Sequence, residues 1–346
     1  YSETNKYGSD GNLTKKSHGL KYKPTYTDTY TYDASGMLAT EKRMEETTPI
    51  YSYVYTYDTR GNRVGLTDNV NGETSGYTYD LNNRLLTLDK TVADIRPYSS
   101  LTSYYYDPNG NTVSSVTETL NEWHGSDDSD YGITEDFGSV MDGYAFTLNE
   151  YDVYNRLTHV KNSEHDARYT YNPDNLRRTK TVDGNTETFL WNPASEIVAT
   201  IVDNSVQNTY VYGLDRILGI DALGTKTYYQ QNGHHDTLLV SDKNGNTVSS
   251  YVYDAFGTQL NSNANDTNPF RYTGEYFDAE TGFIYLRARY MNPETGRFIS
   301  EDPACDGINW YAYAGGNPVR YYDPSGYSFE DSIAGIITAL DEGALA

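Results

Sequence analysis

The chain has little cysteine, a deficit of positive charge and no long apolar segment. Its one cysteine, Cys305, excludes a framework of internal disulfides. The 26 Lys and Arg residues against 49 Asp and Glu give a net charge of −23. That balance argues against nucleic acid or an anionic membrane as the main partner, since both bind through basic patches. No run of about 18 apolar residues is present, so no membrane span is predicted.

Most large apolar residue types are also scarce, with 9 Phe, 3 Trp and 4 Met, whereas tyrosine accounts for 37 of the 346 residues. This composition is untypical of a Leu- and Ala-rich helical protein or a coiled coil. Tyrosine offers a large apolar area with a polar tip, so the chain can still bury a core. The chain begins at Tyr1 without Met and without a charged-then-apolar leader, and we expect it to be a piece of a longer protein.

The tyrosines recur in one short phrase: an aromatic residue, any residue, Tyr, Asp, two residues, then Gly or Asn. The phrase reads YTYDASGML from Tyr30, YTYDTRGNRV from Tyr55 and YTYDLNNRLLTL from Tyr77. The gaps between successive copies are 20 to 27 residues, apart from two of 45 and 41, which indicates a repeat array. The residues that open the turns are Asp33, Asp58, Asp80, Asp107, Asp152, Asn172, Asn192, Gly213 and Asp254.

Each copy of the phrase predicts a β-hairpin. Tyr-x-Tyr places two rings on one face of a strand, and Asp followed by Gly or Asn is typical of a tight turn. A lone hairpin is barely stable, so we expect the repeats to pair edge to edge in one continuing sheet and the fold to be all-β. The tyrosines are interpreted as the structural seam of that sheet, and a sugar-binding surface is the alternative.

Two segments of the predicted array, 1–269, invite other interpretations. The stretch 118–143 is predicted to be an acidic insertion, and a calcium site is conceivable there because carboxylates cluster in it. His234, His235 and Asp236 form a second candidate cluster. Three consecutive strand residues point to alternating faces, so we do not expect them to bind one ion. No metal and no cofactor are predicted.

From Phe270 the pattern changes to GEYFDAETGFIYLRARYMNPETGRFISEDP and then NWYAYAGGNPVRYYDPSGY. Together with the YxYD repeats and the HxD…YxYDAFG unit, these motifs resemble the rearrangement-hotspot (Rhs) and YD-repeat proteins, up to Tyr327. That family includes bacterial polymorphic toxins, C subunits of insecticidal toxin complexes, wall-associated toxin proteins and animal teneurins. The resemblance implies a hairpin array over 1–269, an Rhs-associated core domain over 270–327, and the start of a variable toxin region over 328–346.

The resemblance also implies an architecture. The hairpins are expected to spiral into a hollow shell, or cocoon, and the core domain to plug one end of it. In the toxin branches, the shell encloses the polypeptide that follows the core domain. At the start of that region, Ile333, Ile336, Ile337 and Leu340 recur at helical spacing, which predicts a C-terminal helix.

The family cleaves itself at a DPxG signature followed by an apolar residue, here Asp323 to Gly326 and then Tyr327 in place of the usual Leu or Met. The resemblance therefore implies cleavage of the Tyr327–Ser328 bond. It also implies that Asp302, Asp323 and Arg289 are catalytic.

The residues themselves allow that chemistry. Two neighbouring carboxylates share a proton, so that one can deprotonate water while the other assists the carbonyl. An Arg beside them would keep one acid ionised or stabilise the oxyanion.

Simpler interpretations remain open for the same residues. Asp-Pro pairs are common turn starters, so Asp302 could be a turn residue. Arg287 and Arg289 are expected on the same face of one strand, where they could merely pair with acids. Asp306 is a reserve candidate for the second acid. Cys305 is not expected to act as a nucleophile, because no His follows His235.

These observations predict an encapsulating shell of a secreted bacterial toxin, which releases its cargo by one aspartyl-type self-cleavage and acts on no external substrate. Its partners would be its own C-terminal toxin domain and other subunits of a secretion or toxin complex, with no nucleic acid and no membrane span. Secretion or the bacterial cell surface is the expected location. The alternatives are a non-catalytic surface or adhesion scaffold, and a carbohydrate-binding protein.

Overall fold

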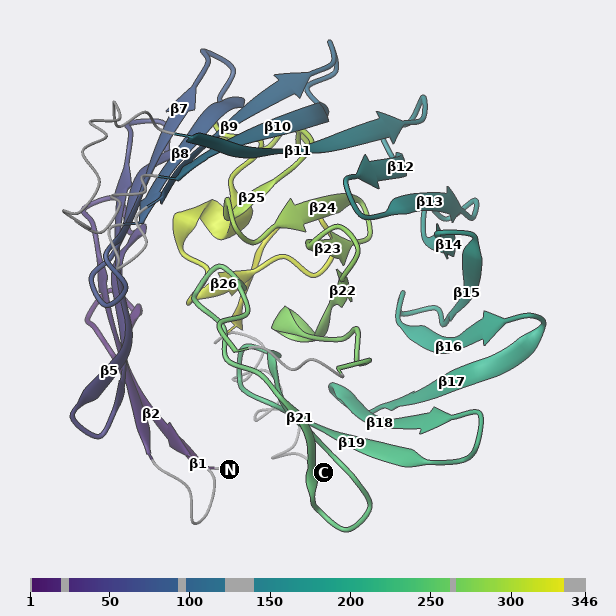
Figure 1. The fold of residues 1–346 in the computed structure, drawn as a ribbon. Coiled ribbons are helices and arrows are strands. Elements are labelled where there is room, and N and C mark those ends of the chain that lie inside the picture. The colour runs from purple at the N-terminus through teal and green to yellow at the C-terminus, as the bar shows by residue number, and fades with distance from the viewer. Residues whose placement is uncertain (1, 20–24, 93–97, 122–139, 262–265, 333–346) are drawn as a thin grey trace, which may run out of the picture. The chain divides into compact units, whose positions relative to one another are not determined.

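The structure is a computed structural model that describes residues 2–19, 25–92, 98–121, 140–261 and 266–332. The chain divides into two compact units. Unit 1 comprises residues 1–107 and 112–147, and unit 2 comprises residues 108–111 and 148–346. The hairpins after residue 148 therefore belong to the same unit as the segment that begins at Phe270. The strands of both units are labelled in Figure 1.

Unit 1 is a run of antiparallel strands in which each strand from β1 to β10 pairs with its neighbours in the chain. The strand β11 (Val140–Tyr151) leads from unit 1 into unit 2. The strands of the run are β1 (Ser2–Tyr7), β2 (Leu13–Gly19), β3 (Tyr26–Tyr32), β4 (Leu38–Glu45), β5 (Thr48–Tyr57), β6 (Arg63–Asp68), β7 (Glu73–Tyr79), β8 (Leu85–Val92), β9 (Tyr98–Tyr106) and β10 (Thr112–Asn121).

Unit 2 continues the same pattern, with antiparallel pairing in chain order from β12 to β21. These strands are β12 (Leu157–Asn162), β13 (Asp166–Tyr171), β14 (Arg177–Val182), β15 (Asn185–Trp191), β16 (Ile197–Val202), β17 (Ser205–Tyr212), β18 (Arg216–Asp221), β19 (Lys226–Gln231), β20 (Thr237–Ser241) and β21 (Thr247–Ser250).

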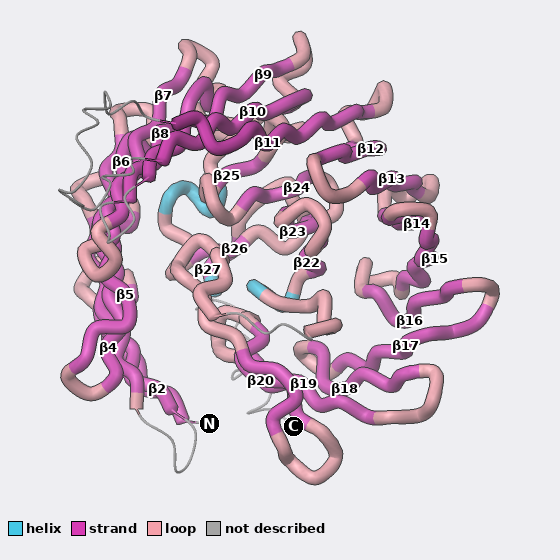
Figure 2. The backbone as a smooth tube through the Cα atoms, viewed as in Figure 1, coloured by secondary structure: helices cyan, strands magenta, loops and turns pink. Residues whose placement is uncertain are grey.

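The rest of unit 2 forms two small sheets. One contains four strands, β22 to β25, and the other pairs β26 with β27. The prediction of a nearly all-β fold built from β-hairpins is confirmed, as the predominance of strands in Figure 2 shows. The elements are η1 (Tyr272–Gly274), β22 (Tyr276–Asp278), β23 (Phe283–Leu286), β24 (Arg289–Asn292), β25 (Arg297–Phe298), η2 (Tyr313–Gly316), β26 (Tyr321–Tyr322) and β27 (Glu330–Asp331).

The turns explain why Asp opens each repeat and Gly or Asn stands three residues later. Asp33 Oδ1 accepts hydrogen bonds from the backbone nitrogens of Ser35 (2.8 Å) and Met37 (3.0 Å). Gly36 adopts a positive φ of 83° and donates its N–H to the carbonyl of Asp33. Asn83 fills the same position with a φ of 64° in the turn that Asp80 opens. Turn residues that tolerate positive φ are thus required by the backbone.

In several repeats the second aromatic ring of the phrase links one hairpin to the previous one. Tyr79 donates from its hydroxyl to the carbonyl of Arg63 over 2.7 Å, and Trp191 donates its indole N–H to the carbonyl of Arg177 over the same distance. Such bonds join the first strand of one repeat hairpin to the second strand of the hairpin before it, in addition to the backbone pairing of these strands. The interpretation of the tyrosines as a structural seam therefore has a geometric basis. The same bond is made by Tyr32, Tyr171, Tyr212 and Tyr253.

A turn that the aromatic phrase does not mark fills one of the two long gaps in the array. Asn232 opens a turn with the same hydrogen bonds, because its Oδ1 accepts from the backbone nitrogens of His234 and Asp236, both at 2.9 Å. His235 occupies the position of positive φ, at 65°. The gap of 41 residues therefore contains one further repeat, in which Gln231 and Asn232 stand in place of the usual Tyr and Asp.

The core of unit 2 lies between its hairpins and the four-stranded sheet. In β23, Phe283 and Tyr285 belong to one buried cluster, which includes Tyr169, Phe189 and Tyr210 of the hairpins. Ile284 and Leu286 point to the other side, into a cluster with Tyr253 and Phe298. All four residues of this strand are buried, so both of its faces are packed. Figure 2 shows β22 to β24 beside the hairpins from β12 to β15.

A buried ion pair joins the hairpins to the four-stranded sheet. Arg177 at the start of β14 and Asp278 at the end of β22 are both fully buried, and Nη1 and Oδ2 lie 2.5 Å apart. Lys180 reaches the same carboxylate at 3.2 Å. The Arg177 guanidinium also lies over the ring of Tyr285, 4.4 Å from its centroid. Hairpin array and core segment thus share one interior in unit 2.

Several predictions fall on residues outside the described ranges. Most of the predicted acidic insertion is among them, and at its ends the structure has strand, with β10 extending to Asn121 and β11 beginning at Val140. The predicted C-terminal helix, from Ile333, also lies outside. The hollow shell and the end plug stay predictions. In the part of the chain that is described, no helix is long and apolar enough to cross a membrane.

Candidate active site

The structure brings the two Asp-Pro acids together around one arginine. Arg289, the first residue of β24, places Nη2 3.3 Å from Asp323 Oδ2 and 3.7 Å from Asp302 Oδ1. All three residues are buried, with exposed fractions of 5%, 2% and 7% for Arg289, Asp323 and Asp302. Residues separated by 34 positions in the chain therefore form one cluster with two carboxyl groups and one guanidinium.

The two acids have different environments. Burial raises the pKa of Asp323 above its usual value, although Arg289 and the N–H groups of Ser325 and Gly326 act in the opposite direction. Asp302 accepts hydrogen bonds from the backbone nitrogens of Ala304 (2.9 Å) and Asp306 (3.3 Å). Burial also lowers the pKa of Arg289, against the attraction of both carboxylates. Burial thus favours the protonated form of Asp323. A pair of carboxyl groups that holds one proton between them can serve as acid and base in the same reaction.

The segment that contains the DPxG signature is held in register by the connection between β23 and β24. Arg287 donates from Nη1 to the carbonyl of Pro324 over 2.6 Å. The backbone nitrogen of Ala288 donates to the carbonyl of Ser325 over 3.1 Å. Arg289 donates from Nε to the carbonyl of Gly326 over 2.5 Å. Three successive residues thus bind three successive carbonyls, and the next carbonyl along the chain is that of Tyr327.

Gly326 is required by this close approach. Its φ is +73°, and a Cβ added to it would lie 2.6 Å from the carbonyl oxygen of Leu286 and 2.7 Å from the backbone nitrogen of Arg289. Its own N–H donates to Asp323 Oδ1 over 2.7 Å. The glycine of the signature therefore serves both the backbone conformation and the contact with the β23–β24 connection.

The predicted cleavage residues lie at the edge of this cluster. Tyr327 is 46% exposed, and Ser328 is exposed as well. A cavity of about 340 Å³ within unit 2 has Tyr327, Arg289 and Asp302 among its lining residues. The cavity gives Asp302 access to space large enough for water, next to the residue that precedes the predicted cut.

The chain is also held just after the predicted cut. Tyr321 and Tyr322 of β26 pair with Asp331 and Glu330 of β27. Arg320 Nε lies 2.9 Å from Asp331 Oδ2, side chain to side chain. The backbone between Asp323 and Phe329 is therefore a loop whose two ends are fixed by the same two-stranded sheet.

Some sequence expectations about this region need correction. Arg287 and Arg289 do not lie on one face of one strand, because β23 ends at Leu286 and β24 begins at Arg289. Arg287 stands in the connection with a φ of +64°. Cys305 and Asp306 are exposed, and Cys305 lines the cavity without a histidine among its lining residues. The turn interpretation of Asp302 also holds in part, since its carboxylate organises the turn that comes after it.

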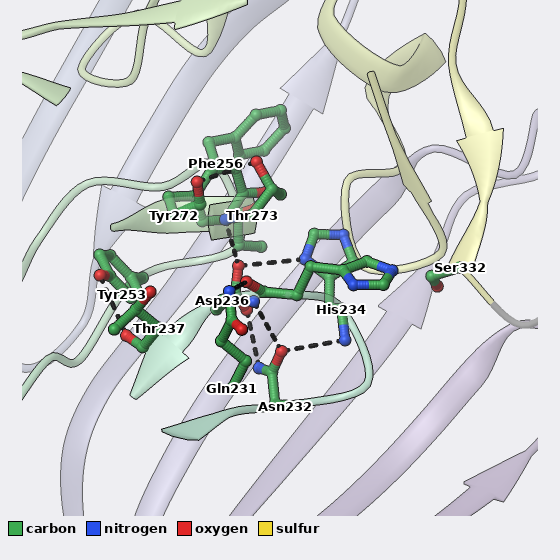
Figure 3. Close-up of polar contacts among 12 residues, drawn as sticks. Gln231, Asn232, His234, Asp236, Thr237, Tyr253, Phe256, Tyr272, Thr273 and Ser332 are labelled. Atoms are coloured by element: carbon green, nitrogen blue, oxygen red, sulfur yellow. Dashed lines mark hydrogen bonds and ion pairs between the residues drawn. The ribbon is translucent and has the colours of Figure 1, made fainter. Parts of the chain in front are cut away.

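The sequence argument about His234, His235 and Asp236 assumes that they lie on a strand. In the structure they lie in the turn that Asn232 opens and directly after it. Asp236 accepts from Thr273 N over 2.9 Å and lies 3.2 Å from His234 Nδ1, as Figure 3 shows. His235 instead pairs with Asp215, at 2.6 Å. These residues hold the turn against η1, and no group of three or more metal-ligating side chains occurs among the described residues.

Sequence reasoning missed the role of Arg287 and the carbonyl of Trp310, which accepts from Arg289 Nη1 over 3.0 Å. The YLRARY motif does not indicate the role of Arg287, because the partners of this residue, Ser195 and Pro324, lie far from it in the sequence. The carbonyl of Trp310 cannot be predicted from the sequence, because every residue carries a backbone carbonyl.

Comparisons with known proteins agree with the sequence resemblance. A family model described as the teneurin YD-shell matches residues 1–331. The tRNA nuclease WapA of Bacillus subtilis strain 168 is 32% identical over 270 residues, which cover 74% of this chain and 11% of that protein. The toxin protein Tse5 of Pseudomonas aeruginosa is 38% identical over 91 residues, which cover 26% of this chain and 7% of that protein.

The chain thus spans about a tenth of the length of the WapA relatives that it matches. Among solved structures, the crystal structure of TcdB2-TccC3 is similar with a TM-score of 0.44 and 19% sequence identity. That similarity covers 94% of this chain and 21% of the other.

Proposed function

Because the chain belongs to the teneurin YD-shell family, we propose that it forms the closing part of the encapsulating shell of a bacterial toxin. The hairpin array would be the wall, the segment 270–327 would plug one end, and the residues from Ser328 onward would begin the enclosed cargo. Relatives named as a tRNA nuclease and as a toxin support a toxic C-terminal region as that cargo. A secreted or cell-surface location, and other subunits of a delivery complex as partners, belong to the same proposal.

The reaction that we assign to the shell is one hydrolysis of its own chain between Tyr327 and Ser328. The observation that carries this assignment is the convergence of Asp302 and Asp323 on Arg289, beside the backbone of the DPxG segment. Paired carboxyl groups can hydrolyse a peptide bond without a serine or cysteine nucleophile. No activity on external substrates is proposed.

The raised pKa of Asp323 assigns the roles. Asp302 takes a proton from a water molecule, and the resulting hydroxide adds to the carbonyl carbon of Tyr327. Asp323, protonated, gives its proton to the carbonyl oxygen. In the collapse of the tetrahedral intermediate one of its two hydroxyl groups returns a proton to Asp323, the C–N bond breaks, and the nitrogen of Ser328 takes up the proton held by Asp302. The products are a carboxyl group on Tyr327 and an amine on Ser328. Arg289 stabilises the negative charge on the pair throughout.

Intact mass after expression tests the proposal. The wild-type chain is expected to break after Tyr327, and Asp302→Asn and Asp323→Asn are each expected to stay whole. Asp306→Asn, which changes an exposed carboxyl near the cluster, is expected to break like the wild type. A folded wild-type chain that stays intact would contradict self-cleavage, and the non-catalytic scaffold would then be the better assignment.

A further inference from the structure

Arg287 has no part in the proton transfers proposed above, yet it contacts three separate segments of unit 2. Its Nη1 donates to the carbonyl of Pro324 over 2.6 Å and lies 2.5 Å from Glu275 Oε2. Its Nε and Nη2 both donate to the carbonyl of Ser195, over 3.2 Å and 3.1 Å. The guanidinium thus joins the cleavage segment, the residue before β22 and a hairpin turn.

The hairpin turn at Ser195 is one of the repeat turns. Asn192 opens it, with Oδ1 accepting from the backbone nitrogens of Ala194 (2.9 Å) and Glu196 (3.0 Å). Ser195 holds the position of positive φ, at 60°, so its carbonyl orientation depends on the turn geometry. Arg287 binds that carbonyl with two of its donors, which a planar guanidinium can do and a lysine ammonium cannot.

Arg287 also has a strained backbone, with a φ of +64°. A non-glycine residue in this region is strained, and such conformations persist where surrounding contacts impose them. Here the contacts to Ser195, Pro324 and Glu275 impose it. The same backbone turn places Ala288 N against the carbonyl of Ser325. The side chain of Arg287 therefore fixes the connection on which the DPxG segment rests.

We propose that Arg287 is a positioning residue for self-cleavage, and that through the carbonyl of Ser195 it makes cleavage depend on the seating of the β15–β16 turn. This inference rests on the proposed function. The scissile carbonyl is the next one after the three that residues 287 to 289 bind, so a shift of the connection displaces it relative to the acids. A displacement of about 1 Å can slow an enzymatic step roughly 100-fold. Cleavage thereby reports that the hairpin wall has assembled against the core segment.

The experiment follows cleavage of the full chain during cell-free synthesis, by intact mass at successive times after synthesis is stopped. Arg287→Ala is expected to lower the first-order rate by about 10- to 100-fold. Arg287→Lys keeps the positive charge but not the planar set of donor nitrogens, and its rate is expected to fall between that of Arg287→Ala and that of the wild type. Methylguanidinium at millimolar concentration is expected to raise the cleavage rate of Arg287→Ala several-fold and to leave the rate of the wild type unchanged. Arg168→Ala, at an exposed arginine of β13, is the matched control and is expected to cleave like the wild type.

A second pair of variants tests the link to the hairpin wall. Asn192→Ala removes the acceptor that organises the Ser195 turn and is expected to slow cleavage several-fold. Asp242→Ala removes the same acceptor from the turn between β20 and β21, where Asp242 Oδ1 binds the nitrogens of Asn244 and Asn246. Arg287 makes its contacts with Ser195, Pro324 and Glu275, none of which belongs to the Asp242 turn. Asp242→Ala is therefore expected to cleave at the wild-type rate.

The outcomes separate this inference from the proposed function. A wild-type chain that stays intact overturns the proposed function and the inference with it. Cleavage of Arg287→Ala at the wild-type rate overturns the inference alone. A slow Arg287→Ala chain with a lowered melting temperature and no response to methylguanidinium also overturns it, because the residue is then merely structural. If Arg287→Ala does not fold, Glu275→Gln replaces it, and an unchanged cleavage rate in Glu275→Gln and Arg287→Lys overturns the inference.

Discussion

The backbone nitrogen of Gly326 donates a 2.7 Å hydrogen bond to Oδ1 of Asp323, so one of the two buried acids is held by the segment next to the proposed cut. The acid and the chain that it would act on are therefore oriented together. Any change in the backbone of residues 324 to 326 alters the position of the carboxyl group as well as that of the scissile bond.

Replacing Gly326 by Ala should stop or greatly slow cleavage. The residue has a φ of +73°, and the added Cβ would lie 2.6 Å from the carbonyl oxygen of Leu286. We expect at least a tenfold lower rate, which corresponds to about 1.4 kcal/mol in the barrier. Gly282→Ala is the matched control, because Gly282 has a φ of +75° but open space around its Cβ position. Time-resolved intact mass measures the cleavage rates of the two variants. Equal rates for Gly326→Ala and Gly282→Ala would contradict the prediction.

The cleavage rate should fall as the pH rises. Burial raises the pKa of Asp323, so its proton is lost, and the rate falls, as the pH rises through that raised value. Refolding the denatured, uncut chain by dilution into buffers from about pH 4 to 8 and measuring initial rates checks this expectation. A rate that only increases across that range would favour a thiolate at Cys305, which Cys305→Ser would test.

The buried pair of Arg177 and Asp278 should be important for the stability of unit 2. Asp278→Asn leaves the guanidinium of Arg177 buried beside a neutral side chain, and we expect a loss of about 3–5 kcal/mol in the free energy of unfolding. Asp174→Asn, in an exposed turn, should unfold like the wild type. Urea unfolding monitored by tryptophan fluorescence is suitable because Trp191 packs against the same core. Equal unfolding midpoints for the two variants would contradict the prediction.

Unit 1 should lose stability in acid because of Asp28. Burial opposes its ionisation, but hydrogen bonds from Arg43 and His18 outweigh burial and hold the pKa of Asp28 well below its usual value. The ionised form therefore stabilises the folded state above the unfolded pKa of about 3.9, and this stability is lost as the pH falls below it. Unfolding free energies measured from about pH 7 down to about pH 2 should stay level above about pH 5 and decrease below it. Asp28→Asn should flatten that dependence, whereas the exposed Asp89→Asn should keep it.

The hydroxyl of Tyr79 should contribute to stability, and that of Tyr105 should not. Tyr79 donates to the carbonyl of Arg63, which links neighbouring hairpins, while the ring of Tyr105 is 54% exposed. Tyr79→Phe should cost about 1 kcal/mol, and Tyr105→Phe close to nothing. Thermal unfolding of both variants measures the difference. A result in the reverse order would favour the alternative in which the tyrosines serve a binding surface.

The repeat phrase allows the hairpins to be predicted because each of its positions has a local physical reason. Asp33 organises a turn, Gly36 adopts positive φ, and Tyr32 binds a backbone carbonyl, and all of these depend on residue type. The turn opened by Asn232 is harder to recognise, since its strand ends in glutamines instead of the aromatic phrase. Its backbone nonetheless makes the same hydrogen bonds, because Asn supplies the acceptor that Asp supplies elsewhere.

The candidate site is predictable only in part. The resemblance names Asp302, Asp323 and Arg289, but their meeting depends on how β24 packs, which no local pattern encodes. The alternating motif predicts Arg287 on a strand with Arg289, because such alternation usually indicates one strand. The connection between β23 and β24 instead consists of Arg287 and Ala288 alone, and contacts from distant segments determine its backbone.

The pairing of β26 with β27 determines the fate of the two fragments after hydrolysis. Both sides of the loop from Asp323 to Phe329 are fixed, so breaking the Tyr327–Ser328 bond would leave the new ends next to each other. Cutting would then leave the two fragments associated. Their separation would require the Tyr321–Asp331 and Tyr322–Glu330 pairs to unzip, a step whose rate depends on mechanical or thermal opening and not on the chemistry of the acids.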